Sequence, residues 1–116
     1  IPLHYHKEFE FFVVTKVTAK IRYAGNVMQL NTLEGIFINS QTLHASADSS
    51  EENGFSFVAI VFSPEFIAPE YDSFYQKFLR PIMKNELAVP IMLTKTMVSV
   101  IMDTEHCVQC LRKRRN

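Results

Sequence analysis

Residues 4–14 read HYHKEFEFFVV, and this stretch decides the fold. From Phe9 onward it consists mostly of aromatic and β-branched side chains, which suit a pleated, half-buried surface. We therefore predict a β-strand over residues 9–15. Further strand-like segments follow at residues 19–23, 27–30, 35–38, 43–47 and 55–62. Because turn-forming residues separate several of these short strands, the protein is expected to be mainly β, as a sandwich or a barrel.

The same stretch carries two imidazoles and a carboxylate at even spacing. Side chains on a strand alternate between its two faces, so His4, His6 and Glu10 are expected to point the same way. Phe12 shares that face, and His44 follows near another predicted strand. Imidazole and carboxylate groups either ligate a divalent metal or hydrogen-bond a polar molecule. They also bond one another or the backbone, so the residues alone leave three alternatives open.

The chain changes character near Ser63, where helical signals begin. Ser63-Pro64 is typical of a helix start, with serine as the cap and proline at the first helical position. A second short helix is predicted at residues 71–78, and the helical structure is expected to break at Arg80-Pro81. A last strand is predicted at residues 91–93. A C-terminal helix is expected from residue 94 or 96. One broad side of it carries Met97, Val98, Ile101, Met102, Val108 and Leu111.

Composition narrows the class of protein. The 116 residues fit one domain, and twelve basic against twelve acidic residues give no net charge, whereas free-standing nucleic-acid binders carry a basic excess. No stretch approaches the ~18 apolar residues of a membrane span, so no membrane partner is expected. Two cysteines are too few for a secreted disulfide framework, which favours a reducing, cytoplasmic location. The first residue, Ile1, indicates a processed chain or a fragment.

Two further features lie in the predicted C-terminal helix. Cys107 and Cys110 are one helical turn apart, and we expect them to pack on a helix face, since free cysteine behaves as a small buried hydrophobe. A redox or metal role is the alternative. The basic run at residues 112–115 is interpreted as a solvated helix end, where cations complement the helix dipole.

Three motifs occur in an order that resembles a known family. The first is the opening segment at residues 4–14. The second is EGIFINS at residues 34–40, with His44 after it, and the third is VFSPEF at residues 61–66. Together they resemble the motifs of cupins, and in finer detail the cupin-type ligand-sensing domain of AraC-family bacterial transcriptional regulators. The resemblance extends over essentially the whole chain.

The resemblance implies a cupin barrel, also described as a double-stranded β-helix or jelly-roll, over residues 1–93 with a short helical insertion. Residues 94–116 would form a C-terminal helix for dimerisation and linkage, and the DNA-binding domain would be absent from this chain. The sequence departs from the cupin pattern at residues 15–18, which lack the usual turn glycine. It departs again at Asn39-Ser40, where a proline is common, and this difference argues against a metal-enzyme pattern.

The function implied by the resemblance is ligand sensing, not catalysis. A small polar effector, such as a sugar, would bind in the barrel at His4, His6, Glu10, Phe12 and His44. No cofactor is expected. The chain would form a homodimer through its C-terminal helix, and DNA would be contacted only through the missing domain.

Two other functions stay open at this point. A metal-dependent cupin enzyme, an isomerase or a dioxygenase, would use the same polar side chains around Zn, Ni, Mn or Fe(II). Its metal ligands would be His4, His6, Glu10 and His44. A purely structural dimerisation domain would instead have no pocket large enough for a ligand.

Overall fold

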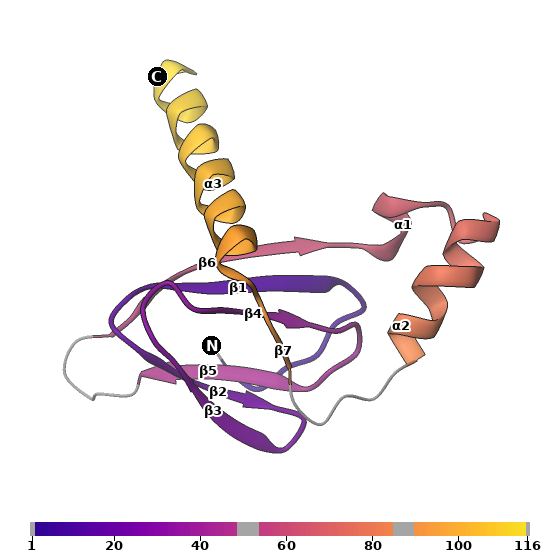
Figure 1. Cartoon of the computed structure of the whole chain (residues 1–116), viewed down its shortest axis with the longest axis horizontal. Coiled ribbons are helices and arrows are strands. Elements are labelled where there is room, and N and C mark those ends of the chain that lie inside the picture. Colours follow the sequence, from indigo (N-terminus) through magenta and orange to yellow (C-terminus); the bar gives the residue numbers. More distant parts are fainter. Residues whose placement is uncertain (1, 49–53, 85–89, 116) are drawn as a thin grey trace.

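Figure 1 shows two facing layers of strands with helices on the outside. The computed structural model describes residues 2–48, 54–84 and 90–115. Its strands are β1 Phe9–Lys16, β2 Ala19–Tyr23, β3 Asn26–Leu30, β4 Gly35–Ile38, β5 His44–Asp48, β6 Ser56–Phe62 and β7 Ile91–Met92. One antiparallel sheet has the order β6-β1-β4-β7, and the other has the order β3-β2-β5. The prediction of a mainly β protein is confirmed, and each predicted strand is present with bounds that differ by one residue at most.

Strand β1 is central to the first sheet. It pairs with β4 along one edge and with β6 along the other, and side chains on both of its faces are buried. Phe12 and Val14 face the second sheet and share a core with Ile21. Phe9 and Val13 face the opposite way, toward the helices. This double burial explains why residues 11–14 of the strand are apolar at every position and not only at every second one.

The β2–β3 hairpin turns at Ala24-Gly25, because Tyr23 pairs with Asn26. Both turn residues have a positive φ, 48° at Ala24 and 86° at Gly25, as a two-residue loop of the primed type requires. Glycine and asparagine tolerate a positive φ most readily, and the sequence has Gly25-Asn26 between the strands predicted at residues 19–23 and 27–30. In the structure Asn26 already belongs to β3, and Ala24 takes the left-handed conformation in its place.

Three short helical segments follow β6. They are α1 Pro64–Ile67, the π-helical turn η1 Tyr75–Leu79, and α2 Arg80–Lys84. Tyr75 and Leu79 pack with Phe9 on the outer face of the first sheet, so η1 covers one end of that face. The segment predicted as a helix at residues 71–78 is therefore helical, although it starts later and continues directly into α2.

The predicted break at Arg80-Pro81 is wrong, because both residues begin α2. Proline lacks an N–H, and in a continuous α-helix the ring of Pro81 would collide with the carbonyl of Lys77. The π-helical turn widens the backbone just before this point, with the Arg80 N–H donating to the Tyr75 carbonyl. The proline therefore changes the type of helix without ending it.

The C-terminal helix α3, Lys95–Arg115, begins against the outer face of the first sheet and then projects away from both sheets (Figure 1). Val98 and Ile101 are buried against Val13. Although α3 is 21 residues long, neither it nor any other helix in the described ranges is apolar enough to cross a bilayer. The predicted apolar side is only partly covered, and its exposed members include Met97 and Val108. Val100, which the prediction did not include, is exposed as well.

The prediction for the two cysteines is wrong, and the reason lies in the half of α3 that projects away from the sheets. Cys107 and Cys110 are exposed, so their expected packing role is wrong. The physical reason is that α3 extends past the sheets, and this part of the helix has no sheet surface to pack against (Figure 1). The side chains of Leu111 and of the basic run at residues 112–115 lie outside the described residues.

The predicted closed barrel is not formed. Among the described strands no ladder joins the two sheets, which are held together by side chains in a shared core. Strand β7, at one edge of the first sheet, is only two residues long and pairs with β4 at Ile36 and Phe37. Such a short edge cannot support a further ladder, so the observed architecture is two separate antiparallel sheets followed by a C-terminal helix.

The β1–β2 turn contains a strained valine. Val17 has a φ of 66°, a left-handed conformation that costs about 1–2 kcal/mol for a residue with a Cβ atom. It lies in the 15–18 turn where the cupin pattern has a glycine. The Thr32 hydroxyl donates to the Val17 carbonyl at 2.6 Å and helps to hold this conformation. The turn is therefore formed without a glycine, at an energetic cost.

We expect Val17→Gly to stabilise the protein by about 0.5–1 kcal/mol, because relief of the left-handed strain exceeds the entropy cost of a glycine. Val17 is exposed, so little burial is lost. Urea unfolding measures the change. The matched control is Val27→Gly, at an exposed strand valine without positive φ, which should lose stability. Equal losses in both variants would contradict the strain argument.

Candidate functional site

The polar site forms where residues 2–8, which we call the N-terminal arm, meet β1 and β5. His4 and His44 form an isolated β-bridge, in which each N–H donates to the other carbonyl at 2.9 Å. Strand β1 starts only after the arm, so His4 and His6 are not part of that strand, contrary to the prediction. The bridge to β5 nevertheless turns both imidazoles toward Glu10, and the arm thereby becomes one wall of the site.

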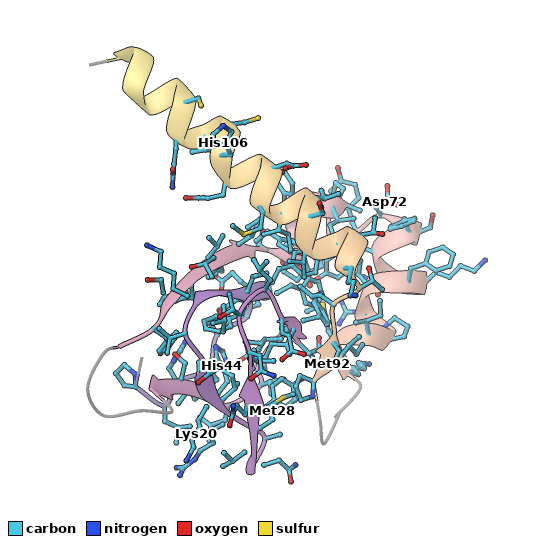
Figure 2. All side chains as sticks on the ribbon, turned by 60° about the vertical axis from the view of Figure 1, so that its left-hand side comes forward. Lys20, Met28, His44, Asp72, Met92 and His106 are labelled. Carbon is cyan, nitrogen blue, oxygen red and sulfur yellow. The ribbon has the colours of Figure 1, made fainter. Side chains whose placement is uncertain are left out.

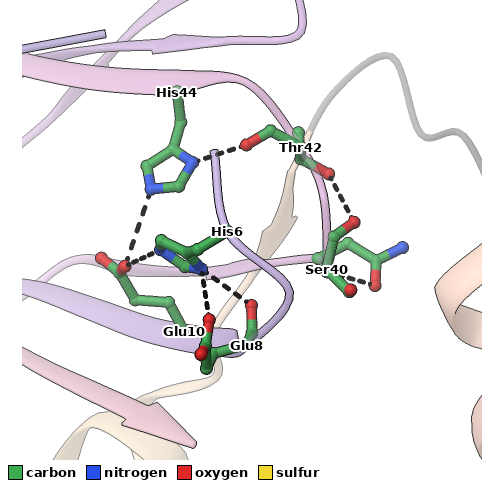
Figure 3. Close-up of polar contacts among 7 residues, drawn as sticks. His6, Glu8, Glu10, Ser40, Thr42 and His44 are labelled. Carbon is green, nitrogen blue, oxygen red and sulfur yellow. Dashed lines mark hydrogen bonds and ion pairs between the residues drawn. The ribbon is translucent and has the colours of Figure 1, made fainter. Parts of the chain in front are cut away.

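Three imidazoles and one carboxylate converge at this point. One donor atom from each of the four residues, His4, His6, Glu10 and His44, lies within 4.8 Å of the others. Glu10 Oε1 is 3.1 Å from His6 Nε2 and 3.6 Å from His44 Nε2 (Figure 3). Glu10 and His44 are buried, whereas His4 and His6 are half-buried. The cluster is therefore anchored in the core and reaches solvent on the side of the arm.

Each imidazole is oriented by a backbone carbonyl through its Nδ1 atom. The Nδ1–oxygen distances are 2.7 Å from His4 to Pro2, 3.0 Å from His6 to Glu8, and 2.7 Å from His44 to Thr42. A carbonyl oxygen only accepts hydrogen bonds, so Nδ1 carries the hydrogen in every ring. In a neutral ring Nε2 then holds the free lone pair. Carbonyl contacts of this kind also fix the tautomer of histidines that bind metals.

The donor set can be tested for its fit to a cation. His6 Nε2 faces a carboxylate oxygen at 3.1 Å, and two acceptors this close require a proton or a metal ion between them. The buried His44 Nε2 faces the same carboxylate oxygen at 3.6 Å, just beyond hydrogen-bonding distance. Nitrogen and carboxylate donors suit divalent ions such as Zn²⁺, Mn²⁺, Fe²⁺ and Ni²⁺. The four residues therefore fit a divalent metal, and equally a protonated site that hydrogen-bonds a polar molecule.

Electrostatics couple Glu10 to His44. Burial by itself raises the pKa of Glu10, but the nearby imidazoles of His44 and His6 outweigh it and hold the pKa below the usual 4.5. Burial lowers the pKa of His44, but the Glu10 carboxylate and the Thr42 carbonyl outweigh it and hold the pKa above the usual 6.5. Without a metal, the site therefore favours ionised Glu10 beside protonated His44.

A cavity of about 430 Å³ lies over the cluster. This size is within the ~300–1,000 Å³ range of small-molecule pockets. Its polar lining residues are His4, His6, Glu8, Glu10, His44 and Ser46. Its apolar walls include Phe12, Ile21, Ile38, Ala59 and Val61. All five residues that the sequence nominated for ligand binding, His4, His6, Glu10, Phe12 and His44, therefore line one cavity.

Other lining residues were not singled out from the sequence. Glu8 lies between His6 and Glu10 in the alternating pattern, and its Oε2 is 3.7 Å from His6 Nδ1. Ile38 and Val61 are the cross-strand partners of Glu10 on β4 and β6. The alternation of side chains along an extended segment could have identified Glu8 as a lining residue. The two cross-strand neighbours depend on pairing register, which no short segment encodes by itself.

Comparison with known proteins gives one line of evidence. No family model matches the chain. Over 83 residues, which are 72% of this chain, it is 29% identical to YdeC, an uncharacterized HTH-type transcriptional regulator of Bacillus subtilis (strain 168). The matched segment is 28% of YdeC, so the chain spans little more than a quarter of that protein's length. The chain is thus similar to one part of a transcriptional regulator.

The pKa shifts predict how the stability of the metal-free protein varies with pH. His44 contributes fully below pH 6.5, and its contribution is lost as pH rises through its raised folded-state pKa. Glu10 contributes fully above pH 4.5, and its contribution is lost as pH falls through its lowered folded-state pKa. The stabilisation from this pair is therefore greatest between pH 4.5 and 6.5.

Urea unfolding of chelator-treated wild type and Glu10→Gln at a series of pH values measures this effect. The stability advantage of the wild type should be largest inside that window and should shrink on both sides. The matched control is Glu8→Gln, which removes a more exposed carboxylate from the same arm-side cluster and should give a flatter difference. An advantage that keeps growing above pH 6.5 would contradict the assignment of the charges.

Proposed function

We propose that this chain is the effector-sensing domain of an AraC-type transcriptional regulator, with a cupin-like pair of sheets around its pocket. The carrying observation is a single cavity that holds the His/Glu cluster, in a chain whose similarity to an HTH-type regulator covers 72% of its length. The matched segment is only 28% of that regulator, and the proposal places the DNA-binding part in the length that is not matched. The role proposed for this chain is binding, not catalysis.

The proposed effector is a small polar molecule such as a sugar. His6, His44 and Glu10 offer a combination of donors and acceptors that suits hydroxyl and carboxylate groups. Phe12 and Ile21 supply apolar surface for the carbon skeleton of the ligand. A mostly apolar cavity with a few converging polar groups is the usual construction of a small-molecule site.

The position of the cavity supports signalling. It is lined by the N-terminal arm, by β1, β4 and β6 of the first sheet, and by β2 and β5 of the second. An effector bound there contacts both sheets and the arm at once, so it binds most tightly to the arrangement that brings all three together. Such a difference in affinity between two states is what transmits a signal to an attached domain.

Calorimetry against a panel of sugars and small organic acids tests the proposal. A ligand that binds the wild type should bind at least about tenfold more weakly to Glu10→Gln and to His44→Gln, because a hydrogen bond to a charged group contributes roughly 1.5–3 kcal/mol. The matched control is His106→Gln, on the projecting half of α3, which should leave the Kd unchanged. Unchanged binding in both site variants would show that the site is wrongly placed.

A metal-dependent cupin enzyme, an isomerase or a dioxygenase, is the second candidate. The observation that favours it is the anchoring of all three imidazoles by carbonyls, which leaves their Nε2 atoms available around Glu10. A divalent ion held by His4, His6, Glu10 and His44 would supply Lewis-acid chemistry.

Elemental analysis and calorimetry after chelation separate the two functions. The sensor keeps its Kd without metal, whereas an enzyme carries stoichiometric metal and loses ligand binding when it is removed.

We also propose that the chain forms a homodimer through α3. An apolar groove of about 340 Å³ lies between α3 and the outer face of the first sheet. Met97, Ile101 and Val108 follow one another at spacings of four and seven, which places them on one apolar seam of the helix. The first sheet covers Ile101, whereas Met97 and Val108 stay exposed. Phe66 and Val100 line the groove and are 83% and 59% exposed. The helix of a second copy would cover this surface.

Analytical ultracentrifugation tests the dimer. Val100→Lys should weaken association at least about tenfold, because it places a charge in a desolvated apolar contact. The matched control is Ser99→Lys, which adds the same charge one position away, where Ser99 does not line the groove. A wild-type chain that stays monomeric at high micromolar concentration would refute the proposal.

A further inference from the structure

The projecting half of α3 carries two thiols and an imidazole that the proposed function does not use. Cys107 and Cys110 are both free and exposed. Free cysteine is among the residue types most often buried, so two exposed thiols within one helical turn need a chemical explanation. Figure 2 shows His106 on the part of α3 that stands clear of the sheets, whereas His44 lies among the strands. This second group is therefore separate from the His/Glu cluster.

The three side chains lie on neighbouring turns of one helix. His106 Nε2 and Cys110 Sγ are 3.7 Å apart and form a weak hydrogen bond across a spacing of four residues. Cys107 precedes Cys110 by three residues, which places it on the adjacent turn of the same side. Exposed side chains change rotamer within nanoseconds. All three donors can therefore gather around one ligand without movement of the backbone.

We propose that His106, Cys107 and Cys110 form a surface site for a thiophilic divalent metal ion of the zinc class. Thiolate and imidazole are the donors that zinc prefers, and two thiolates balance the charge of a dication. On binding, each thiol releases its proton to solvent and forms a metal–sulfur bond, with no change in oxidation state. The remaining coordination position is filled by water or by the carboxylate of Asp103, one turn before Cys107.

Two of the three proposed ligands lie away from the α3 surface assigned to the dimer. An α-helix has about 3.6 residues per turn, so positions two apart point to nearly opposite sides. His106 and Cys110 each lie two positions from Val108, which belongs to the apolar seam. His106 and Cys110 therefore point away from the apolar seam, whereas Cys107 follows the groove residue Val100 by seven residues and lies at the border of the dimer surface. The inference rests on these three side chains and does not depend on the proposed sensor function.

Cadmium titration of the reduced protein tests the site. Thiolate-to-cadmium charge transfer absorbs in the ultraviolet, and Cys107 and Cys110 are the two cysteines of the chain, so the band reports on this site alone. The wild type should reach saturation at one cadmium ion per chain, and added zinc should suppress the band. Cys107→Ser and Cys110→Ser should each weaken binding at least about tenfold, and His106→Ala should weaken it by a smaller factor.

The matched control is His6→Ala, which alters the His/Glu cluster and should leave both the band and the affinity unchanged. Circular dichroism of each variant verifies that α3 stays folded, as expected for substitutions at exposed positions. Absence of the band at stoichiometric cadmium would overturn the proposal, and so would wild-type affinity in either serine variant. Saturation at one ion per two chains would also overturn it, because the ligands would then come from two copies.

Discussion

The structure depends on the burial of β1 on both faces and its pairing along both edges. Its inward side chains meet the second sheet, its outward side chains receive the helices, and its edges hold β4 and β6. One inward position is a glutamate, since Glu10 is only 6% exposed. A carboxylate buried in this way is costly unless it is paired. The fold must therefore bring partners to Glu10, and the arrangement of the arm and of β5 follows from that requirement.

The partners of Glu10 come from two segments that are distant in sequence. His6 belongs to the N-terminal arm and His44 to β5, and each brings its Nε2 toward the same carboxylate oxygen. Neither ring can turn toward solvent without losing the carbonyl contact of its Nδ1. The contacts that offset the buried charge are therefore the same contacts that hold polar groups ready inside an apolar cavity. The interactions that stabilise the buried carboxylate are therefore the ones on which the proposed ligand binding depends.

Local signals predicted the strands well, and the errors had non-local causes. Turn residues and β-branched runs placed each strand to within one residue, because these signals act through nearby backbone geometry. Arg80-Pro81 was expected to be a break, but the π-helical turn before it removes the clash. Cys107 and Cys110 were expected to be packed, but α3 extends past the surface that would cover them. The prediction of a closed barrel was also wrong, because closure requires pairing between strand edges that are far apart in the sequence.

The sequence by itself determined that the protein is mainly β and that Glu10 and Phe12 share a face, because alternation is a property of the strand backbone. It also supplied the polar residues of the site. Only the tertiary structure decided that the arm bridges to β5, so that His4 and His6 meet His44, and that Ile38 and Val61 complete the cavity. The reason is physical: alternation is encoded within a few residues, whereas register and docking depend on contacts between residues far apart in the chain.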